Sequence, residues 1–403
     1  MSALSIRWFG GSSDLNFMKI VFVSNILSPH QLPLCDEWVK MGINLTFVET
    51  WNVDKATLPI GWRFMGSREY QIDYEHFASN PNEVRQLILE ADAVILGSAP
   101  KSLLRERLKE EKLTFIYSER IFKNLKTELK WPYYLLKFGK EYWNHKKLFV
   151  LCASAFSAYD YKKLFCFKNK AYKWGYFTKV NKLDLEASDV SKQGSIAHLM
   201  WCARFLAWKH PELPIEMAAR LKEKGYKFTL DMYGSGSEKE RTEALSKQLG
   251  VDDVVSFKGD TPNDQVLKAM REHDIFLFTS DKNEGWGAVA NEAMSNGCTL
   301  VASSAIGSVP FLVEDGVNGC IFKSEDINSL TNKVEWLLQH SQERRRMAVK
   351  GYETMSTQWS PQHAAERFLV LANSLANGED TPFSCGPCSK AEVLKNDWYK
   401  EKE

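Results

Sequence analysis

The chain has 403 residues, which is too long for one ordinary hydrophobic core and suits two domains of roughly 150 to 200 residues each. Hydrophobic residues make up 44% of the sequence, charged residues make up 26%, and the net charge is +1, which excludes a disordered chain. No apolar run approaches the roughly 20 residues that span a bilayer, and the N-terminus lacks the core of a signal peptide, so we expect a cytoplasmic protein.

The first half of the chain alternates apolar runs with polar or helical stretches. This pattern predicts an α/β domain over residues 18–185, built on a sheet of short buried strands. The predicted strands are 18–24, 45–48, 93–96, 114–117 and 149–153. Residues 178–194 are polar and show no clear periodicity, so we place the linker to a second domain there.

A basic stretch with interleaved aromatic residues covers residues 120–182. It holds fifteen lysines and arginines against three acidic residues. Such a surface suits the headgroup region of an anionic membrane, where lipid-linked acceptors would be met. The alternative is a solvated basic face over buried aromatic residues, and the charge run alone does not decide between the two. Nucleic acid is not expected, because no recognised binding module accompanies the charge.

The second half repeats the alternation and predicts a second α/β domain over residues 186–360. Its predicted strands are 196–201, 228–233, 254–257, 274–279, 299–303 and 319–322. Helical apolar spacing then predicts a further helix, over residues 361–377.

A polar and charged segment ends the chain, and we expect residues 378–403 to form a flexible tail. The string CGPC, with Cys385 and Cys388, copies the thioredoxin active site but has no strand before it and no helix after it. We favour neither a redox role nor a zinc site, for which two ligands are too few. The other six cysteines are scattered, as in a reduced cytosolic protein.

Two glutamates, Glu284 and Glu292, flank a glycine loop between two predicted strands. Gly285 and Gly287 let the backbone approach a ligand, and the amides at the start of the next helix would face an anion. Both carboxylates could accept hydrogen bonds from the hydroxyls of one sugar ligand. The alternative is a pair of solvated glutamates on a surface helix. Their place at the carboxyl end of a strand favours the ligand site.

Residues 274–322, with DIFLFTS, EGWGAVANEAMSNG, GSVPFLVEDGVNG and CIF, resemble the donor-binding half of the family four retaining glycosyltransferases. The resemblance implies the GT-B fold, with two Rossmann-like domains facing across a cleft and the helix 361–377 crossing back to the first domain. It implies that Glu284 contacts the donor sugar and that Glu292 holds the ribose of the nucleotide. The amides near Gly285, Trp286 and Gly287 would meet the sugar or the diphosphate.

Two cations, Arg204 and Lys209, match the arginine and lysine with which that family binds the donor diphosphate. Fixed cations stabilise the negative charge that grows on the departing phosphate. By the same resemblance, Gly234 lies in a glycine turn beside the nucleotide, and the backbone near Lys258 meets the base. We expect no metal or other cofactor, because the cations offset the phosphate charge and the chain has no Asp-x-Asp motif.

The first domain departs from better-known members of the family. The loop after its first strand, where glycines are usual, contains His30, our favoured active-site histidine, whose pKa suits proton sharing with an acceptor hydroxyl. A structural histidine bonded to a turn is an equal alternative. The regions where many relatives carry a histidine hold Ser98 and the run from Ser118 to Arg120, with Glu119 and Arg120 as second-rank candidates.

Together these features predict a retaining glycosyltransferase in the cytoplasm, and contact with the inner face of the membrane through residues 120–182 stays an open alternative. The enzyme would move a sugar from a nucleotide diphosphate donor to a hydroxyl of a glycan or lipid-linked glycan in bacterial surface polysaccharide synthesis. One alternative is a GT-B enzyme that hydrolyses or epimerises a nucleotide sugar. The other is a non-catalytic protein that binds nucleotide sugars.

Overall fold

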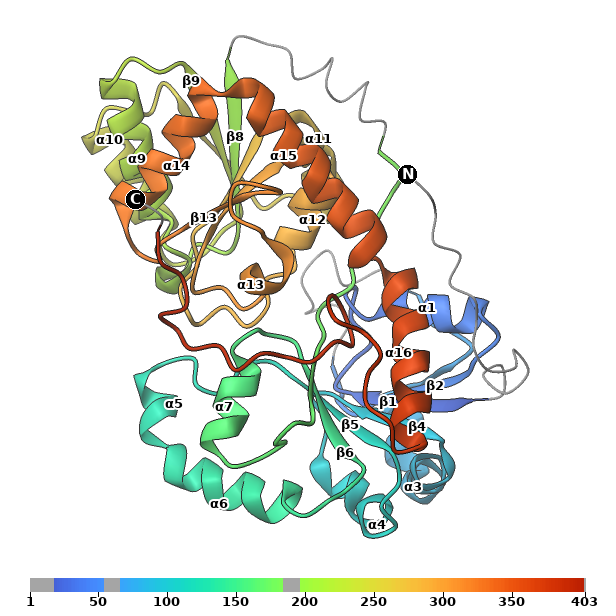
Figure 1. The fold of residues 1–403 in the computed structure, drawn as a ribbon. Helices are drawn as coiled ribbons and strands as arrows, with labels where there is room; N and C mark the ends of the chain where they lie inside the picture. The colour runs from blue at the N-terminus through green and yellow to red at the C-terminus, as the bar shows by residue number, and fades with distance from the viewer. Residues whose placement is uncertain (1–17, 54–65, 184–195, 402–403) are drawn as a thin grey trace.

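A computed structural model describes residues 18–53, 66–183 and 196–401 as two α/β domains stacked one above the other (Figure 1). The expected boundary between the domains, at residues 185 and 186, lies outside the described residues. Both domains are built on a fully parallel sheet with helices packed on its faces, as the alternation of apolar runs predicted.

The first domain contains seven parallel strands. Their order across the sheet is β3-β2-β1-β4-β5-β6-β7. The strands are β1 Lys19–Ser24, β2 Asn44–Glu49, β3 Gln71–Ile72, β4 Ala93–Leu96, β5 Thr114–Ser118, β6 Leu148–Cys152 and β7 Ala171–Lys173. The helices are α1 Leu32–Lys40, α2 Tyr74–Ser79, α3 Pro81–Glu90, η4 Lys101–Leu104, α4 Arg105–Lys109, α5 Leu125–Leu129, α6 Trp131–Tyr142 and α7 Ser157–Lys163.

The second domain contains six parallel strands. Their order is β10-β9-β8-β11-β12-β13. The strands are β8 Ala197–Cys202, β9 Phe228–Tyr233, β10 Val255–Gly259, β11 Ile275–Phe278, β12 Thr299–Ser303 and β13 Cys320–Phe322. The helices are η5 Ala207–Lys209, α9 Glu212–Glu223, α10 Lys239–Gln248, α11 Asn263–Glu272, α12 Val289–Ser295, α13 Val309–Leu312, α14 Ile327–Gln339, α15 Ser341–Glu353 and η6 Thr354–Gln358.

All eleven predicted strands are present. The two that the sequence did not predict, β3 and β7, have two and three residues, too few to show a hydrophobic pattern. In both sheets the strand order reverses at one point, between β1 and β4 and between β8 and β11. Such a reversal opens a crevice at the carboxyl ends of the strands, which is where open α/β sheets bind ligands.

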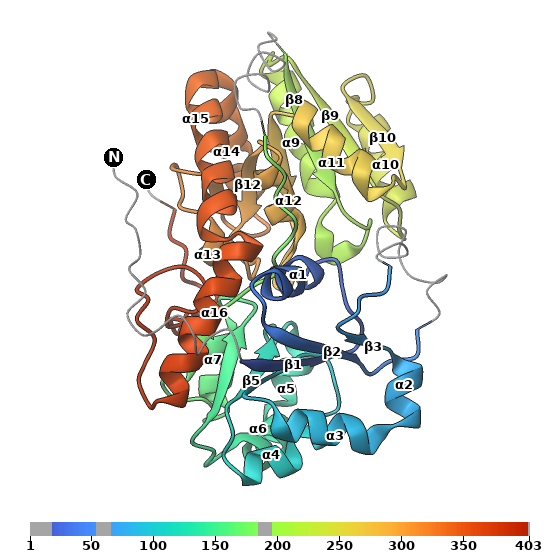
Figure 2. The same cartoon turned by 90° about the vertical axis from the view of Figure 1, so that its right-hand side faces the viewer.

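The helix α16, Pro361–Ala376, returns the chain to the first domain, as the resemblance implied. It lies beside α1 in both views (Figures 1 and 2), and the indole of Trp38 donates a 3.2 Å hydrogen bond to the carbonyl of Ala365. Ser360 caps its first turn by accepting a hydrogen bond from the amide of His363, and Pro361 suits the first position of a helix.

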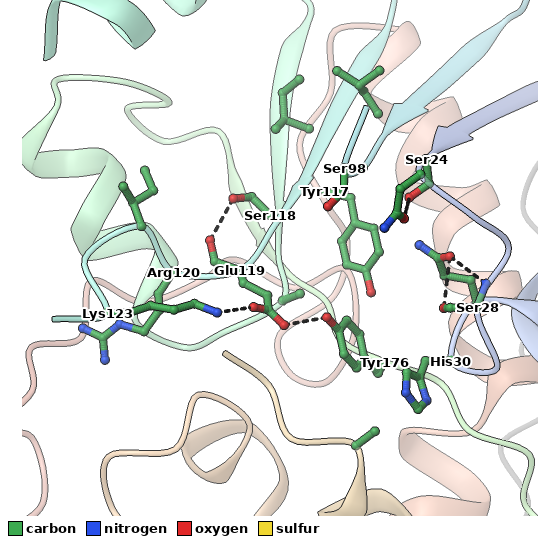
Figure 3. A pocket seen from close by; sticks show the side chains of 18 of the residues that line it. Ser24, Ser28, His30, Ser98, Tyr117, Ser118, Glu119, Arg120, Lys123 and Tyr176 are labelled. Atoms are coloured by element: carbon green, nitrogen blue, oxygen red, sulfur yellow. Dashed lines mark hydrogen bonds and ion pairs between the residues drawn. The ribbon is translucent and has the colours of Figure 1, made fainter. Parts of the chain in front are cut away.

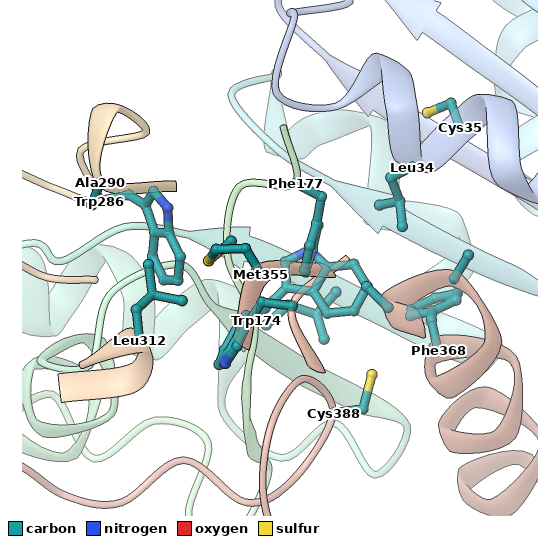
Figure 4. Close-up of a cluster of buried hydrophobic side chains, with 14 of the residues drawn as sticks. Leu34, Cys35, Trp174, Phe177, Trp286, Ala290, Leu312, Met355, Phe368 and Cys388 are labelled. Carbon is teal, nitrogen blue, oxygen red and sulfur yellow. The ribbon is translucent and has the colours of Figure 1, made fainter. Parts of the chain in front are cut away.

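A continuous apolar core joins the two domains. Trp174 and Phe177 of the first domain and Trp286, Met355 and Leu312 of the second belong to one buried cluster (Figure 4). The amide of Ala155, just after β6, donates a 2.8 Å hydrogen bond to the carbonyl of Gly307 across the interface. The structure is therefore a closed arrangement in which the domains pack on each other.

The segment 378–401, here called the strap, corrects our expectation of a flexible tail. It leaves α16, pairs with the edge strand β7 through a bridge between Tyr172 and Lys390, and ends on the second domain (Figure 1). Cys388 is completely buried in the strap. The indole of Trp398 donates to the carbonyl of Ser304 at 2.9 Å, and the Tyr399 hydroxyl donates to the carbonyl of Ile321 at 2.6 Å. The sequence did not predict this packing, because the strap is mostly polar and only a few of its residues anchor it.

Within the described residues, no helix combines the length and the apolar composition that crossing a lipid bilayer requires.

Candidate active site

A cavity of about 760 Å³ lies between the two domains. Ser24 and Ser98 line it from the ends of β1 and β4, and Arg204 and Glu284 line it from the loops after β8 and β11. The cavity therefore lies where the strand order of both sheets reverses. His30 and Gly287, also predicted from the sequence, line the same cavity.

The wall formed by the second domain carries paired charges. Lys209 forms an ion pair with Glu284, and the hydroxyl of Ser280 donates to the same carboxylate at 3.0 Å. Both partners of the ion pair are 12% exposed, so little water screens it. Arg204 is exposed at the cavity and has no ion pair with any described carboxylate. The wall thus presents one available cation and one carboxylate whose present partner is a lysine.

The glycine loop after β11 allows the domains to approach closely. Gly287 has φ of +82°, and a Cβ there would lie 2.3 Å from the ring of Phe278. A Cβ on Gly285 would lie 1.9 Å from Oε2 of Glu119, so a first-domain carboxylate touches this loop. The side chain of Trp286 is completely buried and donates to Asn291 at 2.9 Å. It belongs to the apolar core between the domains, whereas Glu284 and Gly287 of the same loop line the cavity.

Six predicted donor residues are not among those that line the cavity, namely Lys209, Gly285, Trp286, Glu292, Gly234 and Lys258. Burial raises the pKa of Glu292 to about 7, although the Asn263 side chain opposes the shift. Gly234, with φ of +121°, lies against the carbonyl of Ala203. Lys258 forms an ion pair with Asp231 at 3.2 Å. Their predicted contacts with ribose, nucleotide and base stay predictions.

The first-domain wall is a chain of contacts from His30 to Lys123 (Figure 3). The rings of His30 and Tyr176 stack with centroids 5.2 Å apart and planes 3° from parallel. The Tyr176 hydroxyl donates to Glu119 at 2.5 Å, and Lys123 pairs with the other oxygen of Glu119 at 2.6 Å. Glu119, a second-rank candidate from the sequence, is therefore the carboxylate of this wall.

Burial dominates the protonation of this wall. It lowers the pKa of His30 to about 4, and the negative charge of Glu119 only partly opposes it. Burial also raises the pKa of the Tyr176 hydroxyl well above its usual value, and Glu119 adds to that rise. At neutral pH both groups are therefore uncharged hydrogen-bonding partners.

One group among the described residues could hold a metal ion. The ligand atoms of His210, Asp281 and Glu325 all lie within 4.8 Å of one another. Burial lowers the pKa of His210, but the nearby carboxylates of Asp281, at 3.6 Å, and Glu212, hydrogen-bonded at 2.8 Å, outweigh it and raise the value to about 10. A protonated imidazole has no lone pair for a metal. His210 is instead a cation that fixes Asp281, three residues before Glu284.

Sequence reasoning missed several residues of the cavity. Tyr176 follows the short strand β7, and Phe138 and Tyr142 lie on the inner face of α6 within the basic stretch. The only sequence signal for them is aromatic content, which buried aromatic residues share.

Comparison with known proteins points to one family. The sequence model described as "Glycosyl transferases group 1" matches residues 196–354. The chain is 28% identical over 176 residues to the lipopolysaccharide core biosynthesis glycosyltransferase LpsE of Rhizobium meliloti, covering 44% of this chain and 49% of LpsE. It is 29% identical over 150 residues to the D-inositol 3-phosphate glycosyltransferase of Corynebacterium aurimucosum, covering 36% and 35%. The chain thus spans half or less of the length of these relatives.

Solved structures resemble a larger part of the chain. HepE of Anabaena, in complex with UDP and glucose, has a TM-score of 0.63 at 16% identity, covering 89% of this chain and 100% of HepE. Sucrose-phosphate synthase of Thermosynechococcus elongatus also has a TM-score of 0.63, at 15% identity, covering 90% and 100%. The predicted GT-B fold is confirmed, and residues 196–354 of the chain are similar to the glycosyl transferases group 1 family.

Proposed function

We propose that the protein is a retaining glycosyltransferase that moves a sugar from a nucleotide diphosphate sugar to a hydroxyl of a glycan or lipid-linked glycan. The observation that carries the proposal is the cavity between the two domains, because it brings Arg204 and Glu284 opposite His30 and Glu119. Cations and a sugar-binding carboxylate on one wall face hydrogen-bonding groups on the other. This suits transfer between two bound substrates.

The ion pair between Lys209 and Glu284 suggests how the donor is received. A diphosphate between Arg204 and Lys209 would draw the ammonium of Lys209 from Glu284, which frees that carboxylate for the hydroxyls of the sugar. The two cations would then stabilise the charge of the departing phosphate. Glu292 would hold the ribose. The reaction as proposed uses no metal.

The acceptor hydroxyl would approach from the first domain. His30, neutral above about pH 4, would share a hydrogen bond with it, and the departing phosphate would take its proton on the same face of the sugar. This gives net retention at the anomeric carbon. Bacterial surface polysaccharide synthesis is the process we propose, since the similar protein LpsE is named for lipopolysaccharide core synthesis.

The first test is a panel of nucleotide sugars in thermal unfolding. A ligand at 100 times its dissociation constant should stabilise the protein by about 2.7 kcal/mol. The sugar nucleotide that shifts the unfolding temperature is then incubated with glycan acceptors, and NMR of the product reads the anomeric configuration. Inversion would contradict the retaining mechanism. Rapid turnover without any acceptor would instead indicate a hydrolase or an epimerase.

We also propose that the helices α5 and α6 contact the membrane, on its cytoplasmic side. Leu125, Leu129 and Leu136 are 66%, 72% and 74% exposed, and these helices carry five of the thirteen large apolar side chains that are exposed in the described residues. Exposed lysines share the helices, namely Lys126, Lys130, Lys137 and Lys140. Apolar and basic side chains together suit an anionic lipid surface.

All eight cysteines are free thiols, as a reducing compartment favours.

Vesicle sedimentation tests the membrane contact. The double variant Leu129→Glu, Leu136→Glu should bind vesicles containing anionic lipid much more weakly than the unmodified protein. Leu249→Glu is the control, because Leu249 is 39% exposed on the second domain. Equal binding by the double variant would remove this face from the proposal.

A further inference from the structure

Arg120 is a buried cation that the proposed reaction does not use. It lies in the loop between β5 and α5, is 4% exposed, and lines the cavity between the domains. Its guanidinium carbon lies 4.7 Å from the centre of the Phe156 ring. In Figure 3 it extends from the same loop as Glu119, on the side of Glu119 away from His30.

The hydrogen bonds of Arg120 are incomplete. Nη2 donates to the side-chain oxygen of Asn396, in the strap, at 2.9 Å. Nε and Nη1 are buried and have no acceptor among the described residues. Nor does Arg120 form an ion pair with any described carboxylate. The nearby carboxylate of Asp160 instead accepts from the amides of Ile121 and Phe122, at 2.7 and 2.9 Å.

Arg107 is a buried structural arginine whose hydrogen bonds are complete. It is 1% exposed, and all three of its guanidinium nitrogens donate to protein oxygens. Nε donates to Thr114, Nη1 donates to the carbonyls of Ile88 and Ala91, and Nη2 donates to that of Leu113. A buried charge without such partners is costly. The difference indicates that the partner of Arg120 is a ligand.

We propose that Arg120 binds an oxyanion, a phosphate or carboxylate group, carried by the acceptor. This rests on the proposed glycosyltransferase function. Guanidinium groups are suited to both oxyanions. Arg120 belongs to the first-domain wall, whereas Arg204 and Lys209, the cations assigned to the donor diphosphate, lie on the second. Lys123 and Lys101, also at the cavity, are paired with Glu119 and Glu141, so Arg120 is the available cation of the described first wall.

The test uses the full chain and inorganic phosphate as the probe. The nucleotide diphosphate that the protein binds most tightly is present at a saturating concentration, so that the donor site is filled. Phosphate should raise the unfolding temperature of the unmodified protein. In Arg120→Met its affinity should fall by about tenfold or more, the loss expected for one charged hydrogen bond. Arg241→Met, at an arginine whose side chain is 85% exposed on α10, should bind phosphate normally.

Stability separates a binding role from a structural one. Without phosphate, Arg120→Met should unfold at the same temperature as the unmodified protein or at a higher one, because it removes a buried charge with one partner. Arg107→Met should unfold at a clearly lower temperature. Unchanged phosphate affinity in Arg120→Met, or destabilisation like that of Arg107→Met, would overturn the proposal.

Two further measurements identify the carrier of the oxyanion. Acetate in place of phosphate distinguishes a carboxylate ligand from a phosphate ligand. Binding of either anion supports the site if Arg120→Met lowers its affinity. If Arg120→Met lowers the affinity for the nucleotide diphosphate by the same factor as the affinity for phosphate, Arg120 binds the donor. The assignment to the acceptor is then wrong. If no nucleotide binds but phosphate binds through Arg120, the proposed function fails and the oxyanion site stands.

Discussion

The two walls of the cavity treat their charged groups differently. On the second domain, Lys209 and Glu284 neutralise each other, and Arg204 is open to the cavity. On the first domain, His30, Tyr176 and Arg120 are desolvated, and burial is the largest cause of each pKa shift. We expect the ion pair of Lys209 and Glu284 to exchange partners when a phosphorylated donor binds. On the first wall, an acceptor that leaves a desolvated group without a hydrogen bond loses binding free energy. We therefore expect this wall to select the acceptor.

The largest effect should come from the second wall. Glu284→Gln keeps the shape of the side chain but removes the charge that pairs with Lys209 and would accept the sugar hydroxyls. We expect turnover to fall by about 10²–10³-fold, which is typical for loss of one charge-stabilising group. Initial rates of sugar transfer measure it, with Glu240→Gln on the exposed face of α10 as the control. A loss below tenfold would place the charge-stabilising group of this wall elsewhere.

The desolvation of the first wall predicts a pH dependence of stability. His30 has a pKa of about 4 in the folded protein and about 6.5 in an unfolded chain, so the unfolded state takes up its proton first on acidification. The folded state therefore loses stability as the pH falls from about 6.5 to about 4. When the pH is lowered from about 7 to about 4.5, the unfolding free energy of His30→Gln should fall by roughly 2–3 kcal/mol less than that of the unmodified protein.

Urea unfolding at both pH values checks this expectation. His340→Gln, at an exposed histidine, should follow the unmodified protein. If His30→Gln shows the same acid sensitivity as the unmodified protein, His30 is more accessible to water than the first wall requires.

A smaller effect should follow from loosening the strap, which contacts both domains. Trp398→Ala removes a half-buried ring and the hydrogen bond to the carbonyl of Ser304, which should cost about 2 kcal/mol of unfolding free energy. Thermal unfolding measures the loss. Lys395→Ala, at an exposed strap residue, is the control and should change stability little.

The smallest expected effect lies within the first wall. Tyr176→Phe keeps the ring that stacks on His30 but removes the 2.5 Å hydrogen bond to Glu119. We expect an increase in the acceptor KM of about threefold to tenfold, with donor KM unchanged, because the lost hydrogen bond positions Glu119 and is not itself made to the acceptor. An equal rise in both KM values would mean that the two walls do not divide the substrates.

The sequence predicted more of the second-domain wall than of the first-domain wall. Arg204, Glu284 and the glycine loop lie in short segments directly after parallel strands, so strand prediction alone brings them to one edge of the sheet. The first wall depends on long-range packing. Tyr176 meets Glu119 across 57 residues, and Arg120 meets Asn396 across 276, contacts that no local pattern encodes. The strap was mispredicted because its anchors, such as Cys388 and Trp398, are single residues in a polar segment.

The strap also limits how the cavity can open. The chain passes from the first domain to the second between Leu183 and Ile196, and it returns at the entry to α16. The strap adds a third connection, because its amides pair with β7 while Tyr399 holds the second domain. Opening the domains widely must therefore break these bonds, which makes it a local unfolding event. Amide hydrogen exchange at Cys388 and Ala391, whose N–H groups donate to Lys173 and Ala171, would then report how often these bonds open.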